Sequence, residues 1–254
     1  IAYLIDEPLA AAIGAKIPIS TPSGQMIVDI GGGSTEEAEI SLGGVVSHRS
    51  ERTGGNKLVE AIMYYVKKKY NLNISERMAE DIKVKIGSAT PLKERKKMDI
   101  RGSDSISGLP RSVVITAEEV TEAIRPQLIN IIGAVRSVLE QTPPDLASDI
   151  IDKGIVMSGG TSLLRNLDKL MTQQTGVPSH VAEDPLLCVA VGTGWGAEGG
   201  AGVWARGGQA GTSAGDASLT WVDLSRSRDA SGELNVGQER LTAQDAWVTF
   251  THGD

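Results

Sequence analysis

The densest local signal in the chain is a run of three glycines that directly follows an apolar, β-prone segment. MIVDI (26–30) has strand composition, GGGS (31–34) follows it, and TEEAEISL (35–42) then alternates as a strand does. Such glycines let the backbone approach a ligand and point N–H groups at an anion. A dinucleotide-binding turn must open a helix and a P-loop must end in Gly-Lys-Ser/Thr, and neither condition is met. The run predicts a phosphate-binding hairpin turn or, equally, an ordinary glycine hairpin.

A second glycine turn, SGGTS (158–162), also leaves a strand but enters a helix, so its free N–H groups suit a phosphate or the edge of an adenosine. Between the two turns, Glu80 and Lys83 lie on one predicted helix face. They are suited to hold ribose hydroxyls and an adenine edge, although an exposed ion pair explains the same spacing. Glu7, which precedes Pro8 at a helix start, is either a capping residue or a carboxylate that positions an attacking water.

Strands followed by helices indicate an α/β sheet with ligand sites at the strand ends. Ser75 is a predicted N-cap, and Thr116 with Glu119 forms a capping box for a helix that runs to about residue 141, with a kink at Pro126. A linker rich in charge and glycine is predicted at roughly 90–110. The remaining predicted elements are strands at 45–50, 112–116, 154–158 and 180–184 and helices at 56–71 and 161–176.

Composition excludes several classes of function. The net charge of −7 argues against nucleic acid as the main partner. The single cysteine, Cys188, excludes a disulfide framework, and three scattered histidines make a histidine metal site improbable. No apolar run reaches the length of a membrane span, so a soluble intracellular protein is expected. The basic clusters at 67–69 and 92–97 lack aromatic anchors and are interpreted as solvated surface rather than as lipid contacts.

Both ends of the sequence depart from the pattern of a natural domain. The chain opens inside an apolar segment, and all four tryptophans lie beyond residue 194. Residues 196–217 are rich in Gly, Ala and Ser without periodicity, which predicts a disordered or misread tail. SLTWVDL (218–224) and DAWVTFTH (245–252) have strand composition, but two isolated strands do not make a stable domain. We therefore expect a fragment whose function lies in residues 1–194.

Six motifs, taken in order, carry a family resemblance: LIDEPLAAAIG, VDIGGGSTE, AEDIKVKIGSA, LEQTPPDLASDI, GIVMSGGTSLLRNLDKL and AEDPLLCVAVGTG. Together they closely resemble MreB and its paralogue Mbl, the bacterial actins, almost without interruption over residues 1–194. LEQTPPDLASDI in particular separates bacterial actins from the chaperones and sugar kinases that share the phosphate turns. The resemblance implies the second half of an actin-like ATPase fold (ribonuclease-H-like, α/β) that surrounds a nucleotide cleft.

The resemblance also implies an ATP and Mg²⁺ site in the complete protein. Glu7 would orient the hydrolytic water with Thr35, and Asp29 would reach the metal through water. The residues that would cradle the β- and γ-phosphates are Gly31, Gly32 and Gly33, with hydroxyls from Ser34 and Thr35. The residues that would face the ribose and base are Ala79, Glu80, Asp81, Ile82 and Lys83. The residues that would close over the adenosine are Gly159, Gly160, Thr161 and Ser162.

The family template divides the chain and names its partners. The implied segments are 1–15 (end of the first half), 16–50 and 112–183 (core subdomain), 51–111 (outer subdomain), 184–198 (a return helix) and 199–254 (a tail of unknown role). Family members self-assemble into ATP-dependent filaments on the inner membrane surface and direct the wall-elongation machinery that maintains rod shape. The implied location is therefore cytoplasmic and membrane-associated, without nucleic acid.

The sequence departs from the family pattern at three places. The first half is absent, so the ATP site is incomplete and ATPase activity of this chain alone is uncertain. Glu37 and Glu39 stand where the family usually has valine; with Ala38, Ile40 and Leu42 predicted on the opposite face, these carboxyls are costly if helices cover them and harmless if their face is open. After CVAVGTG the family continues as a short helix, whereas here WGAEGG follows. The alternatives are a sugar kinase, a chaperone nucleotide-binding domain or an inactive remnant.

Overall fold

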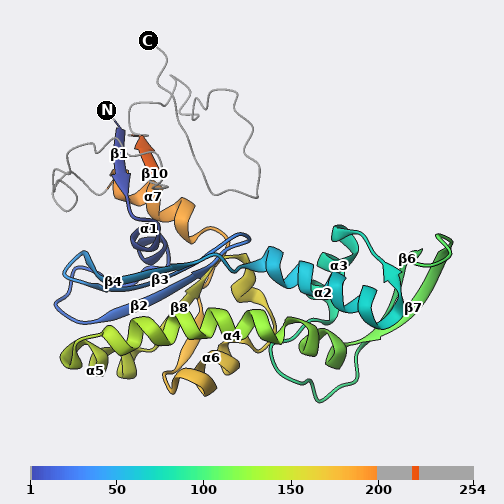
Figure 1. Ribbon diagram of the computed structural model, residues 1–254. Helices are drawn as coiled ribbons and strands as arrows, with labels where there is room; N and C mark the ends of the chain where they lie inside the picture. The colour runs from blue at the N-terminus through green and yellow to red at the C-terminus, as the bar shows by residue number, and fades with distance from the viewer. Residues whose placement is uncertain (1, 199–218, 223–254) are drawn as a thin grey trace, which may run out of the picture.

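The computed structural model describes residues 2–198 and 219–222 (Figure 1). The strands are β1 (Ala2–Ile5), β2 (Gln25–Ile30), β3 (Thr35–Ser41), β4 (Gly44–Glu51), β5 (Leu72–Asn73), β6 (Lys97–Asp104), β7 (Pro110–Thr116), β8 (Ile155–Ser158), β9 (Ser179–Val181) and β10 (Leu219–Val222). The helices are α1 (Glu7–Gly14), α2 (Gly55–Tyr70), α3 (Glu76–Ile86), α4 (Ala117–Gln141), α5 (Pro144–Lys153), the 3₁₀ turn η1 (Gly160–Leu163), α6 (Leu167–Thr175) and α7 (Cys188–Glu198). Among the described helices, none is long and apolar enough to cross a bilayer.

The central sheet has the order β4-β3-β2-β8-β9. β2, β3 and β4 form an antiparallel meander, as the sequence predicts, whereas β2, β8 and β9 run parallel. The parallel strands β2 and β8 end side by side, since Asp29 pairs with Ser158 in the register. Both glycine turns follow these two ends, so the topology brings them to one edge of the sheet.

Helices cover the sheet on both faces, with α4 along one face and α1 with α7 on the other (Figure 1). Met26, Val28 and Ile30 pack on the α4 side, in a core that also includes α2 and α3. Ile27, Ala38 and Ile40 pack on the α1 side. The two apolar faces of β2 explain why its sequence is an almost continuous apolar run.

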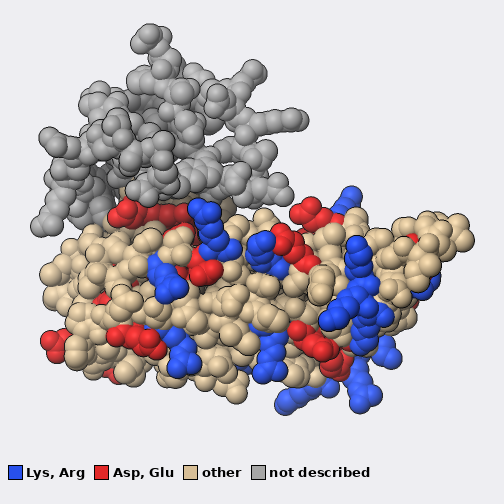
Figure 2. Space-filling view, viewed as in Figure 1, with Lys and Arg blue, Asp and Glu red and all other residues tan. Residues whose placement is uncertain are grey.

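A second sheet, β5-β6-β7, forms with α2 and α3 the far end of the molecule. The predicted linker at 90–110 is wrong in part, because residues 97–104 form β6 and pair with β7. Ile100 anchors this strand in the core. On the face shown in Figure 2, Lys and Arg side chains gather over this end. Lys67, Lys68 and Lys69, in the last turn of α2, are exposed.

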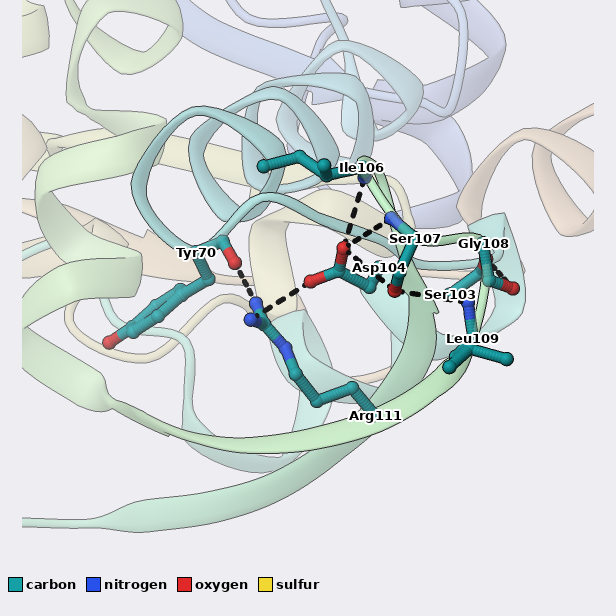
Figure 3. A network of polar contacts seen from close by, with 8 residues as sticks. All are labelled: Tyr70, Ser103, Asp104, Ile106, Ser107, Gly108, Leu109 and Arg111. Carbon is teal, nitrogen blue, oxygen red and sulfur yellow. Dashed lines mark hydrogen bonds and ion pairs between the residues drawn. The ribbon is translucent and has the colours of Figure 1, made fainter.

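The tip of the β6–β7 hairpin is organised by one carboxylate (Figure 3). Asp104 Oδ1 accepts hydrogen bonds from the backbone N–H groups of Ile106 (3.0 Å) and Ser107 (2.9 Å). Its second oxygen lies 2.9 Å from Arg111 Nη1, and Arg111 also donates to the Tyr70 carbonyl. The hairpin is therefore tied to the end of α2.

Local capping signals are confirmed, and one helix is shorter than predicted. The Ser75 hydroxyl accepts from Met78 N–H, and Thr116 with Glu119 forms a complete capping box. The predicted helix at 161–176 is wrong in its first turn: η1 ends at Leu163, and α6 begins only at Leu167, after Asn166 in the left-handed conformation.

Glu37 and Glu39 lie on the α4 face of β3, opposite Val28 and Met26, and both are completely buried. The face is therefore covered rather than open. Leu42 does not continue the apolar stripe, because it lies in the β3–β4 turn and is 70% exposed. Of the predicted tail strands, residues 219–222 form β10 and pair with β1, and 245–252 lie outside the described residues.

Candidate nucleotide cleft

A cleft of about 1000 Å³ opens at the carboxyl ends of β2 and β8. Most of the predicted site residues line it: Glu7, Asp29, Gly31, Gly32, Gly33, Ser34, Glu80, Lys83, Gly159, Gly160 and Thr161. They come from α1, the two glycine turns and α3, which are far apart in the sequence. The fold thus gathers both glycine turns, the carboxylates of Glu7, Asp29 and Glu80, and the Lys83 ammonium around one cavity.

The first glycine turn is closed and then buttressed by α2. Gly31 N–H donates to the Ser34 carbonyl (2.9 Å), which closes the β2–β3 hairpin. The first N–H groups of α2 donate to this turn, from Gly55 to the Gly31 carbonyl (2.9 Å) and from Asn56 to the Gly32 carbonyl (2.8 Å). Gly31 N–H is used inside the hairpin, whereas among the described residues the N–H groups of Gly32 and Gly33 donate no hydrogen bond and remain for the cleft.

The second turn packs directly against the first. Gly159 has φ +81°, and a Cβ there would lie 2.3 Å from the Ile30 carbonyl oxygen, so only glycine fits. The Thr161 hydroxyl donates to the Gly31 carbonyl (2.9 Å), and this bond joins the two turns. The pair forms one rigid wall rather than two separate loops.

Asp29 lies at the base of this wall. Its side chain is only 6% exposed, and its Oδ1 accepts a hydrogen bond from the Ser158 hydroxyl at 2.6 Å. Burial raises the pKa of Asp29, and the Ser158 hydrogen bond opposes that rise. A buried carboxylate with one fixed hydroxyl donor, and with no partner for its second oxygen among the described residues, suits a hydrated cation.

Glu7 is the first residue of α1, with Asp6 at the N-cap and Pro8 in the first turn. Its carboxyl group lines the cleft, and burial, followed by the charges of Asp29 and Glu36, raises its pKa to about 7. A carboxyl group that titrates near neutrality is suited to general base chemistry.

Glu80 and Lys83 form an ion pair at 2.8 Å, and Lys83 Nζ also lies 3.5 Å from the Gly55 carbonyl. The Lys83 side chain is 14% exposed and the Glu80 side chain 49% exposed. Lys83 therefore connects α3 to the N-terminus of α2, beside the first glycine turn. The pair is therefore not simply an exposed ion pair on a helix surface, because the Lys83 side chain is mostly buried beside the turn.

The other predicted site residues do not line the cleft. Ala79 and Ile82 lie in the hydrophobic core, and Asp81 pairs with Lys85 at 3.3 Å. The Thr35 hydroxyl donates to the Thr53 carbonyl (2.6 Å), and that of Ser162 donates to the Gly159 carbonyl (2.6 Å). These two hydroxyls support the turns from behind.

Several cleft residues were not predicted from the sequence. Glu76 precedes Glu80 by one helical turn, so the same periodicity that relates Glu80 and Lys83 extends to it. Asn56 follows Gly54 and Gly55, a glycine pair at a helix start that repeats the glycine-turn signal. The apolar wall formed by Leu164, Leu186 and Val189 has no local sequence signal, because it depends on the packing of α7.

Comparison with known proteins decides the family. The MreB/Mbl protein family matches residues 1–200. The chain belongs to the MreB/Mbl family. It is 51% identical over 192 residues to the cell shape-determining protein MreB of Escherichia coli K12, covering 76% of this chain and 55% of that protein. It is 47% identical to the cell shape-determining protein Mbl of Bacillus subtilis 168, covering 76% and 58%. The chain thus spans a little over half the length of these relatives.

Solved structures of MreB/Mbl relatives give the same fold. MreB5 of Spiroplasma citri, bound to AMPPNP, superposes with a TM-score of 0.72 at 40% identity, over 75% of this chain and 57% of that one. The MreB5 structure bound to ADP gives a TM-score of 0.73. The MamK double helical filament, at 21% identity and a TM-score of 0.61, shows the fold alone. The predicted actin-like ATPase fold and the family resemblance are both confirmed.

Proposed function

We propose that this chain supplies one wall of the ATP site of a bacterial actin that assembles into filaments and maintains rod cell shape. The observation that carries the proposal is the joined pair of glycine turns, with Asp29 at their base and Glu7 facing them across one cleft. The nucleotide-bound MreB5 structures support it, since that protein shares the fold and binds AMPPNP and ADP.

The donor set fits a nucleotide and a magnesium ion. The turn N–H groups of Gly32 and Gly33 would hold phosphate oxygens, and Gly31, whose N–H closes the hairpin, would keep the turn in shape. Asp29 would hold Mg²⁺ through water, since carboxylates on hydrated Mg²⁺ are the usual arrangement. Mg²⁺ would neutralise phosphate charge when bound.

Other residues of the chain would complete the site. Glu7 would orient the attacking water, and Thr35 would hold the first glycine turn in place. Glu80 and Lys83 would face the ribose and base, with Ala79, Asp81 and Ile82 holding their helix, and Gly159, Gly160, Thr161 and Ser162 would cover the adenosine.

The proposal extends to assembly and organisation. We infer self-association into filaments, contact with the wall-elongation machinery and a membrane-associated location in the complete protein. The core segments 16–50 and 112–183 and the outer segment 51–111 would be the subdomains, and the separate β5-β6-β7 sheet supports that division. Filament formation is tested by sedimentation of the chain with and without Mg-ATP.

Thermal unfolding with and without millimolar Mg-ATP tests the nucleotide site. A ligand that binds only the folded state at one hundred times its Kd stabilises it by about 2.7 kcal/mol, which raises Tm. Glu80→Ala is expected to reduce the shift. Glu60→Ala is the matched control, because Glu60 also pairs with a lysine three residues away (Lys57, 2.7 Å) but lies outside the cleft. A cooperative melt with no Tm shift would contradict nucleotide binding by this chain.

A further inference from the structure

A row of four polar side chains crosses the central sheet beside the cleft, and one of them, Asp29, lines the cleft. The strand register pairs Ser158 of β8 with Asp29 of β2, Asp29 with Glu36 of β3, and Glu36 with Ser50 of β4. These residues alternate with the β2 and β3 residues that face α4, so the row lies on the α1 side, the side on which Glu7 begins α1.

Each carboxylate of the row is held by a serine on its outer side. The Ser158 hydroxyl donates to Asp29 at 2.6 Å, and the Ser50 hydroxyl donates to Glu36 Oε1, also at 2.6 Å. His48 Nε2 lies 2.8 Å from Glu36 Oε2, and the Glu36 side chain is 13% exposed against 42% for His48. Glu36 therefore has a fixed orientation.

The two carboxylates in the middle of the row lie directly opposite each other. Side chains at such positions are separated by about 4.5–5.5 Å at Cβ, and like charges there repel. Among the described residues, Asp29 forms no ion pair, and His48 is the basic residue paired with Glu36. A pair of facing carboxylates with one partial counter-ion is a favourable place for a cation and an unfavourable one for a bare phosphate.

We propose that Glu36 is a positioning residue of the cleft, whose charge favours a divalent cation on Asp29 and disfavours nucleotide without metal, and that His48 reduces this effect. Glu36 does not line the cleft, so it acts through Asp29 and the local field rather than by touching the nucleotide. The inference rests on the proposed nucleotide-binding function.

The charges of Glu36 and His48 also act on the cleft carboxyl group of Glu7. The charge of Glu36 is among the causes that raise the pKa of Glu7, after burial and Asp29, and the charge of His48 opposes them. The two side chains thus shift the pKa of this carboxyl group in opposite directions, which agrees with the opposite roles proposed for Glu36 and His48.

The test is equilibrium binding of ATP to the full chain, measured by titration calorimetry at pH 6.5 with excess Mg²⁺ and again with EDTA. The quantity of interest is the ratio of the two affinities. Glu36→Gln keeps the shape of the side chain and one acceptor oxygen for the Ser50 hydroxyl but removes the charge, so the ratio is expected to fall by about tenfold, with weaker binding in Mg²⁺ and tighter binding in EDTA. His48→Gln keeps a donor to Glu36 and removes the opposing charge, so the ratio is expected to rise.

A merely structural role for Glu36 would weaken both affinities together and leave the ratio unchanged, which would overturn the inference. Glu140→Gln, an exposed charge near the end of α4, is the control and should leave the ratio unchanged. If Glu36→Gln does not melt cooperatively, the sign of the His48→Gln change decides. Wild-type chain that binds ATP with an unchanged ratio in both variants would contradict the inference alone, whereas no ATP binding under either condition would overturn the proposed function and the inference with it.

Discussion

Glu37 and Glu39 project from the same face of β3, and neither carboxyl group has a hydrogen-bond partner among the described residues. Both are completely buried beneath α4. Burial is the main cause that raises the pKa of each carboxyl group, to about 8 for Glu37. At Glu39 the nearby Thr142 hydroxyl opposes the rise, although this hydroxyl donates its hydrogen bond to the Val138 carbonyl. The core therefore favours the protonated acids.

Replacing Glu37 by valine should stabilise the chain. Valine restores an apolar contact opposite Val28 and removes a buried polar group without a partner, which is expected to gain roughly 2–4 kcal/mol in the free energy of unfolding at pH 7. Urea denaturation measures the change. Glu37→Gln is the control, since it removes the ability to ionise but keeps an unsatisfied polar group, and it should gain less. A valine variant less stable than the wild type would contradict this account of the core.

Stability should fall as the pH rises toward 8. The pKa of Glu37 is near 4.5 in the unfolded chain, whereas burial raises it to about 8 in the folded protein. Between these values the native state binds more protons, so the free energy of unfolding decreases by about 4–5 kcal/mol across the window and is level above it. Urea midpoints from pH 5 to 9 measure this. The slope should be shallower in Glu37→Val; an equal slope would assign the effect to other groups.

Gly159→Ala should destabilise the chain and abolish nucleotide binding. Gly159 has both a positive φ and a carbonyl oxygen 2.3 Å from the site of a Cβ, whereas Gly176 has a positive φ of +77° and nothing within 4 Å. Gly176→Ala is thus the matched control for backbone strain alone, expected at about 1 kcal/mol. Gly159→Ala should exceed it by about 2 kcal/mol or more. Equal melting temperatures of the two variants would show that the close contact between the two glycine turns is not needed for stability.

Asp104→Ala should loosen the β6–β7 hairpin without unfolding the protein. The substitution removes the acceptor of the Ile106 and Ser107 amides and the partner of Arg111. Faster hydrogen exchange at these two amides is the expected result, with unchanged exchange in β2. Asp99→Ala, an exposed carboxylate on the same strand, should change neither. Unchanged exchange in Asp104→Ala would mean that the turn holds itself through its backbone.

Several features of this protein follow from the sequence alone, because they depend on groups within a few residues. The Ser75 cap and the Thr116–Glu119 capping box involve atoms one helical turn apart, so residue identity and spacing predict them. The glycine turn at 31–33 and the alternation of β3 are likewise local. The family motifs add the expected nucleotide site, since their order fixes which turns belong together.

Other features were decided by distant elements. The first turn of the predicted helix at 161–176 is lost because Arg165 and Asn166 form hydrogen bonds with Ser88 and Ala89 instead. These two partners lie just after α3, far from the predicted helix in the sequence. The strand at 97–104 forms because it pairs with β5 as well as with the adjacent β7, and because Ile100 packs into the core.

The burial of Glu37 and Glu39 shows the same division most plainly. Alternation in the sequence assigns both residues to one face of β3, and it assigns them correctly. Whether that face meets water or a core depends on α4, whose residues come about eighty positions later and whose packing no local pattern records. The sequence by itself determined the caps, the glycine turn at 31–33 and the face of β3 from which Glu37 and Glu39 project. Only the tertiary structure decided which faces became dry, because desolvation depends on every element that packs against a group.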